Sequence, residues 1–215
     1  GEMVAVTGHS GNGLSTLLEL CAGLAEPLAG RVLWQGEDLW RTSPARRSML
    51  RRRVGHVFQR HALISNLTAF ENIALPLRYH TEMTNWEIAE RVEEQLRAAG
   101  IPHVRDRRPE QLSTDQARWV AIARALVVEP ELLFLDEPSA GVDPVTAHTI
   151  VRKIHDIRRA GGATIVMASR RVRVVREMQC RIVVLENRSL SPLTHLGGSG
   201  AGRGKTANTQ HRKNL

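Results

Sequence analysis

The amino-acid sequence predicts an α/β fold in which helices cover both faces of a mainly parallel sheet. Three observations support this prediction. A short apolar run at residues 3–6 is followed by a glycine-rich stretch and then by a helix-like run. Strand-like and helix-like segments alternate in the first and last parts of the chain, as in parallel strands joined by helices. The middle part, residues 67–128, is mainly helical in character and is expected to be an insertion.

The elements expected before the helical part follow from apolar runs and the turn residues between them. They are a buried strand, a helix, an edge strand or hairpin turning at Gln35 and Gly36, a helix with Pro44 in its first turn, and a short strand ending at Gln59. Their expected bounds are residues 4–7, 15–24, 31–34, 44–53 and 54–58.

Two capping boxes mark helix starts inside the helical part. Thr-Asn-Trp-Glu at residues 84–87 begins a helix that is expected to run to Ala98 and to be closed by Gly100. Ser-Thr-Asp-Gln at residues 113–116 fits the same pattern and begins a helix that reaches Val128. These starts support a helical subdomain at residues 67–128.

The alternation of strands and helices returns after the helical part. We expect strands at residues 131–135, 163–168 and 181–185, and a helix at residues 144–159 that Gly161 and Gly162 stop. The sequence is therefore divided into a core of residues 1–66 and 129–190, the helical subdomain of residues 67–128, and a disordered basic tail of residues 191–215.

The tail contains a second stretch, residues 200–206, that is similar to a phosphate-binding loop and includes Lys205. Ser199 stands where its first glycine would be. No strand-like run precedes this stretch and no helix-forming run follows it, so a flexible tail is the preferred interpretation.

Length and composition limit the function classes. A chain of 215 residues is long enough to bury a sizeable core, and two cysteines do not make a disulfide framework. No apolar run approaches the roughly 18 residues that a membrane span needs, so any spanning segments would come from other chains. The formal charge of +8 is interpreted as a solvated basic face rather than as a nucleic-acid site, and no nucleic acid is expected as a partner.

The glycine-rich stretch has the spacing of a phosphate-binding loop, G-x-x-x-x-G-K-[ST], with one departure. Its glycines let successive backbone N–H groups point inward, and the helix start that follows adds a positive dipole. Ser15 offers a hydroxyl to Mg²⁺, whereas Leu14 occupies the position of the lysine that would reach the β and γ phosphates. By itself the stretch is also compatible with a strand–helix turn that binds nothing. The expected cofactor-binding residues here are Gly8, His9, Ser10, Gly11, Asn12, Gly13, Leu14, Ser15 and Thr16.

A second chemical feature is the apolar run of residues 132–135, which ends in Asp136 and Glu137. A carboxylate at a strand end suits Mg²⁺, so Asp136 is expected to hold the metal directly or through water. Glu137 can orient or deprotonate an attacking water. Two solvated acids at a strand end are the alternative interpretation.

Six segments, taken in order, resemble the ATP-binding cassette subunits of ABC transporters. They are the glycine loop of residues 8–16, Val-Phe-Gln at 57–59, Leu-Ser-Thr-Asp-Gln at 112–116, Leu-Leu-Phe-Leu-Asp-Glu-Pro at 132–138, the segment 139–144, and the segment 164–170. In that family they correspond to the P-loop, glutamine loop, LSGGQ signature, Walker B strand, D-loop and histidine switch. The resemblance covers about residues 1–190.

The resemblance implies a P-loop NTPase fold, which is a RecA-like three-layer core with a mainly helical signature subdomain. It implies ATP and Mg²⁺ as cofactors, a second cassette in a head-to-tail dimer, and a membrane permease as partners. It also implies residue roles. The metal would be held by Ser15, Gln59 and Asp136, the catalytic group would be Glu137, Gln59 and Arg170, and Ser113, Asp115, Gln116 and Asp143 would act at the composite nucleotide site.

Departures from the family pattern predict weak nucleotide binding and slow turnover. Leu14 replaces the lysine, which removes a charged hydrogen bond of roughly 1.5–3 kcal/mol. Thr114 and Asp115 replace two signature glycines, and an aspartate about 5 Å from a phosphate charge would repel it by roughly 3 kcal/mol at an effective dielectric of about 20. Arg170 replaces the switch histidine and is expected to be an exposed arginine, although it could partly replace the lysine.

The family also has N-terminal strands, with the aromatic residue that stacks on adenine, and these are absent from the sequence. We therefore expect the sequence to be an excerpt or a truncated chain.

Three functions remain open at this point. The first is the energy-coupling subunit of an ABC transporter at the cytoplasmic face of a bacterial inner membrane, with residues 72–81 resembling the permease-coupling region of importer and lipid-transport cassettes. The second is a non-catalytic regulatory or structural cassette. The third and least favoured is a soluble cassette ATPase that acts on nucleic acid or ribosomes, which the net charge and the basic tail suggest.

Overall fold

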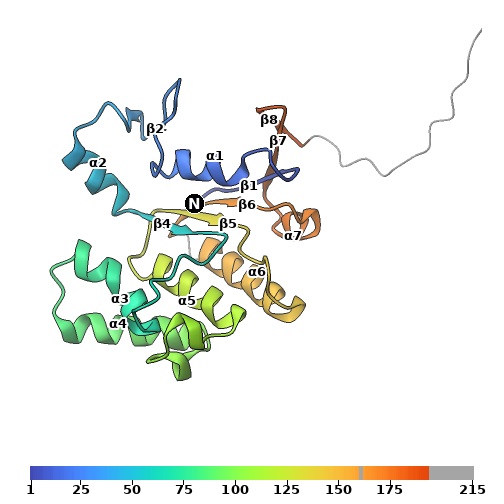
Figure 1. The fold of residues 1–215 in the computed structure, drawn as a ribbon. Helices are drawn as coiled ribbons and strands as arrows, with labels where there is room; N and C mark the ends of the chain where they lie inside the picture. Colours follow the sequence, from blue (N-terminus) through green and yellow to red (C-terminus); the bar gives the residue numbers. More distant parts are fainter. Residues whose placement is uncertain (160–161, 194–215) are drawn as a thin grey trace, which may run out of the picture.

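The computed structural model describes residues 1–159 and 162–193. At its centre lies a six-stranded sheet in the order β4-β5-β6-β1-β7-β8 (Figure 1). The first five strands in this order are parallel, and β8 is antiparallel to β7. The bounds are β1 Met3–Gly8, β4 Val54–Val57, β5 Leu132–Asp136, β6 Thr164–Ala168, β7 Arg181–Glu186 and β8 Ser189–Pro192. The prediction of an α/β fold with a mainly parallel sheet is confirmed.

Helices cover both faces of this sheet. Helix α1 (Leu14–Cys21) lies on one face, and α5 (Thr114–Leu126) and α6 (Pro144–Arg159) lie on the other (Figure 1). Successive residues of each central strand point to opposite faces of the sheet. Because helices cover both faces, the side chains on each face are apolar. Val6, Phe134 and Ala168 belong to the cluster beneath α1, and Ala5, Leu133 and Met167 belong to the larger core on the other face.

The helical part consists of α3 (Ala69–His80), α4 (Asn85–Ala98) and α5, with single 3₁₀ turns at Pro102–Val104 and Pro109–Gln111. Both predicted capping boxes are confirmed, with Thr84 and Glu87 at the start of α4 and Ser113 and Gln116 at the start of α5. A third box at Thr68 and Glu71 begins α3 and escaped the sequence analysis. Each box satisfies two amide groups that a helix start would otherwise leave without partners.

Helix α1 ends at Cys21, three residues before the predicted end at Leu24. Gly23 adopts a left-handed conformation with φ of 68°, which terminates the helix. The Gly23 N–H donates to the carbonyl of Leu20, and the Leu24 N–H donates to the carbonyl of Glu19. This pair of bonds is the Schellman motif, which satisfies carbonyls at the last turn.

A hairpin follows α1. Strands β2 (Leu33–Trp34) and β3 (Glu37–Asp38) are antiparallel, as the turn at Gln35 and Gly36 predicted. The indole N–H of Trp34 donates to the carbonyl of Cys21 at 2.9 Å, which ties the hairpin to the end of α1. Helix α2 (Pro44–Arg51) then leads into β4.

Two elements near the end of the described chain were not predicted. Helix α7 (Val172–Glu177) lies between β6 and β7, and β8 pairs with β7. The β7–β8 turn places Asn187 and Arg188 at φ of 49° and 61°, a geometry that glycine usually provides. Strand β8 ends at Pro192, two residues beyond the boundary at residue 190 that the sequence suggested.

Some expectations lie outside the described residues. They are the helix stop at Gly161, the disorder expected from residue 194 onward, and the Lys205-containing stretch. Among the residues that the structure does describe, none of the helices combines the length and apolar character that crossing a bilayer would take.

Candidate nucleotide-binding site

The glycine loop connects the carboxyl end of β1 to the start of α1. Gly11 and Gly13 both have φ of 86°, in the left-handed region that favours glycine. Gly13 is the N-cap of α1 and leaves the helix start without a side-chain cap. The first amides of α1 are therefore free of side-chain acceptors, and the loop has the geometry of an anion-binding nest.

The loop lies close against β7 and is hydrogen-bonded to it. A Cβ at Gly8 would lie 2.6 Å from the carbonyl oxygen of Leu185, so only glycine fits there without a shift of the backbone. The side-chain amide of Asn12 donates to the same carbonyl at 3.0 Å. His9, Ser10, Gly11 and Thr16 remain exposed around the loop.

Leu14 belongs to the core. Its exposed fraction is 7%, and it joins the apolar cluster between α1 and the sheet, with Val6, Leu18 and Phe134. The side chain at the lysine position therefore contributes to packing, and the glycine loop has no cation of its own.

Asp136 and Ser15 come together at the carboxyl end of β5. Asp136 is 4% exposed, and its Oδ1 atom is buried without a hydrogen-bond partner among the described residues. Burial raises the pKa of Asp136, and a hydrogen bond from Ser15 opposes that shift. A buried carboxylate oxygen that lacks a partner beside a hydroxyl is a donor set that suits Mg²⁺.

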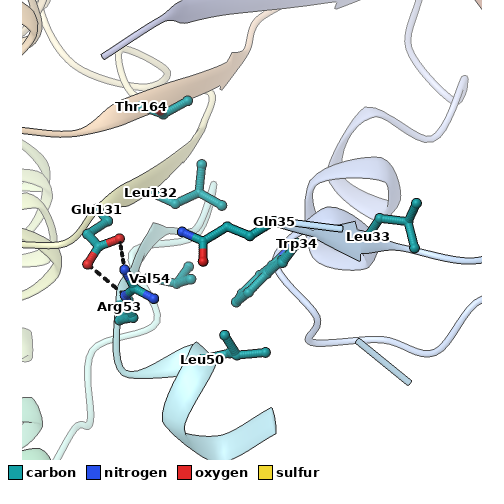
Figure 2. Close-up of a pocket in the computed structure, with 9 residues that line it drawn as sticks. All are labelled: Leu33, Trp34, Gln35, Leu50, Arg53, Val54, Glu131, Leu132 and Thr164. Carbon is teal, nitrogen blue, oxygen red and sulfur yellow. Dashed lines mark hydrogen bonds and ion pairs between the residues drawn. The ribbon is translucent and has the colours of Figure 1, made fainter. Parts of the chain in front are cut away.

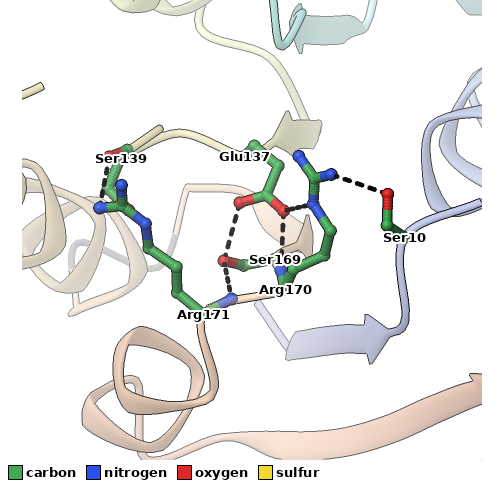
Figure 3. A network of polar contacts seen from close by, with 6 residues as sticks. All are labelled: Ser10, Glu137, Ser139, Ser169, Arg170 and Arg171. Carbon is green, nitrogen blue, oxygen red and sulfur yellow. Dashed lines mark hydrogen bonds and ion pairs between the residues drawn. The ribbon is translucent and has the colours of Figure 1, made fainter. Parts of the chain in front are cut away.

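Glu137 follows in a left-handed conformation, with φ of 47°, and is 3% exposed. Both of its carboxylate oxygens are already occupied (Figure 3). Oε2 accepts the Ser169 hydroxyl at 3.0 Å, and Oε1 accepts the backbone N–H and the Nε–H of Arg170, both at 2.8 Å. A backbone in this region is strained and is a common feature of functional loops.

Arg170 bridges the acid and the glycine loop. Its side chain is 41% exposed, and its Nη1 lies 3.5 Å from the hydroxyl of Ser10. Glu137 raises the pKa of Arg170 through their hydrogen bond and charge. The neighbouring Arg171 points elsewhere, since its Nη1 donates to the carbonyl of Ser139 (Figure 3). Arg170 is therefore exposed, as expected, and it is also paired with Glu137.

Gln59 is exposed in the loop after β4, and the backbone of this loop is held by Arg118 of α5. Arg118 is 1% exposed and donates to the carbonyls of Phe58, Gln59 and Ala140 at 3.0, 2.9 and 3.1 Å. Sequence reasoning missed this residue. The signal was a single arginine inside a run of residues that α5 otherwise buries.

The signature-like residues form a separate cluster. Ser113 caps α5 with Gln116, and Asp115 Oδ2 accepts the hydroxyl of Thr146 at 3.2 Å. Asp143 accepts the N–H of Thr146, and hydrogen bonds from Thr146 lower the pKa of Asp143 to about 2. Burial and the neighbouring Asp143 raise the pKa of Asp115. No hydrogen bond among the described residues joins this cluster to the glycine loop.

A hollow of about 310 Å³ lies at the other end of the sheet, where β4, β5 and β6 begin (Figure 2). Trp34 and Gln35 of the hairpin point toward Val54 and Leu132 across it, and Leu33 lies farther from them (Figure 2). It contains none of the predicted site residues. The candidate site lies at the carboxyl ends of β1, β5 and β6, and Gln59 follows the carboxyl end of β4.

Known proteins are similar to this chain in sequence and in fold. A family model described as ABC transporter matches residues 1–140. Methionine import ATP-binding protein MetN from Bordetella avium is 40% identical over 187 residues, and that from Bordetella pertussis is 39% identical. These alignments cover 87% of this chain and 51% of the relatives, so the chain spans about half the length of the curated proteins it matches.

Solved structures are similar over most of the described fold. The ATP-binding cassette MJ0796, in a dimeric post-hydrolysis state bound to ADP and Pi, superposes with a TM-score of 0.82 at 31% identity. The match covers 91% of this chain and 87% of that chain. A second structure of MJ0796, described as dimeric and as a bacterial ABC transporter cassette, matches equally well.

Proposed function

The chain belongs to the ABC transporter family of ATP-binding cassettes, and on this basis we propose that it is the nucleotide-binding subunit of a bacterial import system in which ATP hydrolysis is slow. The observation that carries the slow turnover is the state of Glu137. Its two carboxylate oxygens are held by Ser169 and Arg170. Only one acceptor position, on Oε2, is left to take a proton from water, so Glu137 is a weak base as long as Arg170 holds it.

Nucleotide binding is supported by the glycine loop and the acidic strand end. The uncapped amides of α1 suit phosphate oxygens, and Asp136 with Ser15 suits Mg²⁺. We propose Gln59 as the third group near the metal, because the loop that bears it is held in place by Arg118. Bound Mg²⁺ would neutralise charge on the terminal phosphates.

Two features weaken catalysis in this proposal. Leu14 is packed into the core, so the glycine loop lacks the lysine that stabilises charge on the transferred phosphoryl group. Asp115 adds a negative charge to the first turn of α5, which is the end of the signature helix that would face a partner's nucleotide. The motifs are degenerate in the positions that matter most for charge.

A second cassette is the proposed partner at the nucleotide site. MJ0796, which shares 31% identity with this chain, is described as dimeric. By analogy, Ser113, Gln116 and Asp143 would approach the nucleotide held by the glycine loop of the other copy. In a homodimer each composite site would combine Leu14 with Asp115.

A membrane permease is the second proposed partner, and it would bind at the groove between α2, β4 and α3. An open groove of about 630 Å³ lies between α2, β4 and α3, in the region that resembled a coupling surface. Arg51 and Arg52 lie along this groove, and Tyr79 and Ile64 expose apolar area there. The relatives named for methionine import support a location on the cytoplasmic face of a bacterial inner membrane.

A phosphate-release assay tests the slow turnover. The unmodified chain is compared with Leu14→Lys, and Leu14→Met serves as a control that keeps an apolar side chain of similar size. We expect little release from the unmodified chain and from Leu14→Met, and more from Leu14→Lys. Brisk release by the unmodified chain would refute the proposal.

A non-catalytic regulatory cassette is the second candidate. The Glu137–Arg170 pair favours it, because a carboxylate that is paired with an arginine is a poor base. If nucleotide binds but no variant at Leu14 or Arg170 hydrolyses it, the regulatory role is preferred. The nucleic-acid alternative rests on the net charge and on the basic tail, most of which lies outside the described residues.

A further inference from the structure

The glycine loop lacks a permanently positive side chain with which to bind the phosphates of the proposed nucleotide. Residues 8–16 contain no lysine or arginine. A nucleoside triphosphate carries several negative charges, and sites for it normally supply at least one cation besides the metal. Some other part of the chain must therefore supply that cation if the site binds a triphosphate.

We propose that Arg170 is the phosphate-binding cation of this site, and that it reaches the glycine loop from the end of β6. The proposal rests on the proposed nucleotide binding and names the group that makes it possible. Its foundation is the position of the guanidinium group, which lies between Glu137 and Ser10 (Figure 3).

Arg170 has donors to spare for a phosphate. Of the five N–H groups of an arginine, Nε–H donates to Glu137 and one Nη1–H donates to Ser10. The remaining three have no partner among the described residues. Because Nε is fixed by a carboxylate that is 5% exposed, the Nη groups project toward the glycine loop. A guanidinium fork held in this way suits two phosphate oxygens.

The neighbouring arginines do not compete for this role. Arg171 directs its guanidinium to the carbonyl of Ser139 at 3.1 Å, on the far side of Glu137 from Ser10 (Figure 3). Arg173 is exposed on α7 and has no hydrogen bond or ion pair within the described part of the chain. Among these three arginines, Arg170 is the one that contacts the loop.

The arrangement also links phosphate binding to Glu137. A terminal phosphate has more negative charge than one carboxylate, so it can draw the guanidinium away from Oε1. Glu137 would then lose its side-chain partner and keep the Ser169 hydroxyl and the Arg170 amide. Arg170 therefore acts in turn on the acid and on the phosphate.

Calorimetric titration of the 215-residue chain tests the proposal. Mg²⁺–ATP, Mg²⁺–ADP, AMP and inorganic tripolyphosphate are titrated into the unmodified chain, Arg170→Gln and Arg170→Lys. Loss of a charged hydrogen-bonding contact predicts that Arg170→Gln weakens ATP and tripolyphosphate by about ten- to a hundred-fold. We expect a smaller loss for ADP, no change for AMP, and intermediate affinity for Arg170→Lys. Arg173→Gln removes the same charge from an exposed position and should bind ATP like the unmodified chain.

Two further variants separate contact from folding. The double variant Glu137→Gln with Arg170→Gln removes the Glu137 carboxylate together with its cation, and it should still show the loss of ATP affinity. Glu137→Gln alone releases Arg170 from its partner and should tighten ATP binding several-fold.

The outcomes also separate this proposal from the one it rests on. If the unmodified chain binds ATP and Arg170→Gln or the double variant binds it equally well, Arg170 is not the cation, and nucleotide binding stands. Equal losses for ATP and AMP, or for Arg170→Gln and Arg173→Gln, also overturn the assignment. If the unmodified chain does not bind ATP, both proposals fail.

Discussion

Two arginines hold the loops around the site, and they are held by different acceptors. Arg118 donates to three backbone carbonyls and is 1% exposed. We call the loop that it holds, residues 58–62 after β4, together with β4 the fixed region. Arg170 donates to the carboxylate of Glu137 and is 41% exposed. We call the glycine loop of residues 8–16, with Asp136, Glu137 and Arg170, the responsive region, because it is the proposed site of phosphate binding. The first arginine joins three segments of the fold, whereas the second joins two functional side chains.

The difference teaches which contacts can change when a ligand arrives. Backbone carbonyls belong to the fold and cannot leave without local unfolding, so the Arg118 contacts serve as structure. A carboxylate is one anion among others, and a phosphate can replace it. The proposed role of Arg170 thus depends on a charged acceptor that a phosphate can replace, whereas the contacts of Arg118 with neutral carbonyls are part of the fold.

The largest expected effect comes from removing the fixed arginine. Arg118→Met fills much of the same space but leaves the carbonyls of Phe58, Gln59 and Ala140 without a donor. We expect the free energy of unfolding to fall by about 3–5 kcal/mol, measured by urea denaturation.

Arg124→Met is the matched control on the same helix. Arg124 donates to the carbonyls of Ala62 and His61 at 2.8 and 3.1 Å, further along the same loop. These residues lie nearer the surface, so we expect a loss of only about 1–2 kcal/mol. Equal losses for the two variants would contradict the central position given to Arg118.

The second-largest expected effect is a loss of folding stability at acidic pH, which we attribute to His56 of β4. His56 of β4 packs against Phe58 with ring centroids 4.2 Å apart, and neither ring nitrogen has a partner among the described residues. Burial lowers the pKa of His56 from 6.5 to about 4. The unfolded chain therefore takes up a proton more readily, and this group costs stability as the pH falls from 6.5 to about 4. The full loss is about 3 kcal/mol.

Denaturation midpoints of the unmodified chain and His56→Met, followed from pH 7 to pH 4, test this effect. The substitution removes the ionisable group and keeps an apolar side chain beside Phe58 and Phe134. We expect the variant to lose less stability on acidification. Parallel curves for the two proteins would show that His56 does not sense the pH.

A smaller loss of stability is expected from substitution of Gly8, because the backbone of the glycine loop lies tightly against β7. Gly8→Ala places a Cβ 2.6 Å from the carbonyl oxygen of Leu185, and β1 must move from β7 to accept it. We expect a loss of about 1–3 kcal/mol in thermal unfolding. Gly11→Ala meets no atom within 4 Å and tests the left-handed conformation alone, with a loss of about 1 kcal/mol. If Gly8→Ala costs no more than Gly11→Ala, the contact with β7 is not tight.

The sequence predicted much of the fold because periodicity, glycines and capping boxes act locally. The five parallel strands of the sheet, α4, α5 and α6 were all anticipated from such patterns. Helix α7 and the β7–β8 turn were missed for a physical reason. Asn187 and Arg188 adopt positive φ without glycine, and α7 is too short for its apolar residues to show a period.

The candidate site was predicted in part. Glycine spacing and a strand ending in two acids locate the loop, Asp136 and Glu137, because these features follow along the chain. Partners that meet only after folding could not be read in this way. The Arg118 contacts join residues about 60 positions apart, and Arg170 reaches Ser10 across 160 positions. Leu14 was recognised as a departure, but its burial depends on Phe134 of a distant strand.

The smallest expected effect comes from Asp136. Its contribution to stability falls as the pH rises, whereas that of His56 falls as the pH is lowered. Burial raises the pKa of Asp136 above the ordinary value of 3.8. The unfolded chain therefore gives up this proton first, so the ionised carboxyl costs stability above that pH. Without metal or nucleotide, Asp136→Asn should be slightly more stable than the unmodified chain at pH 7, and the gain should shrink as the pH approaches 3.8. Thermal unfolding in a chelating buffer measures this, and added Mg²⁺ with ATP should stabilise only the chain that retains Asp136. A variant that is less stable at neutral pH would mean that the charge of Asp136 is already compensated within the fold.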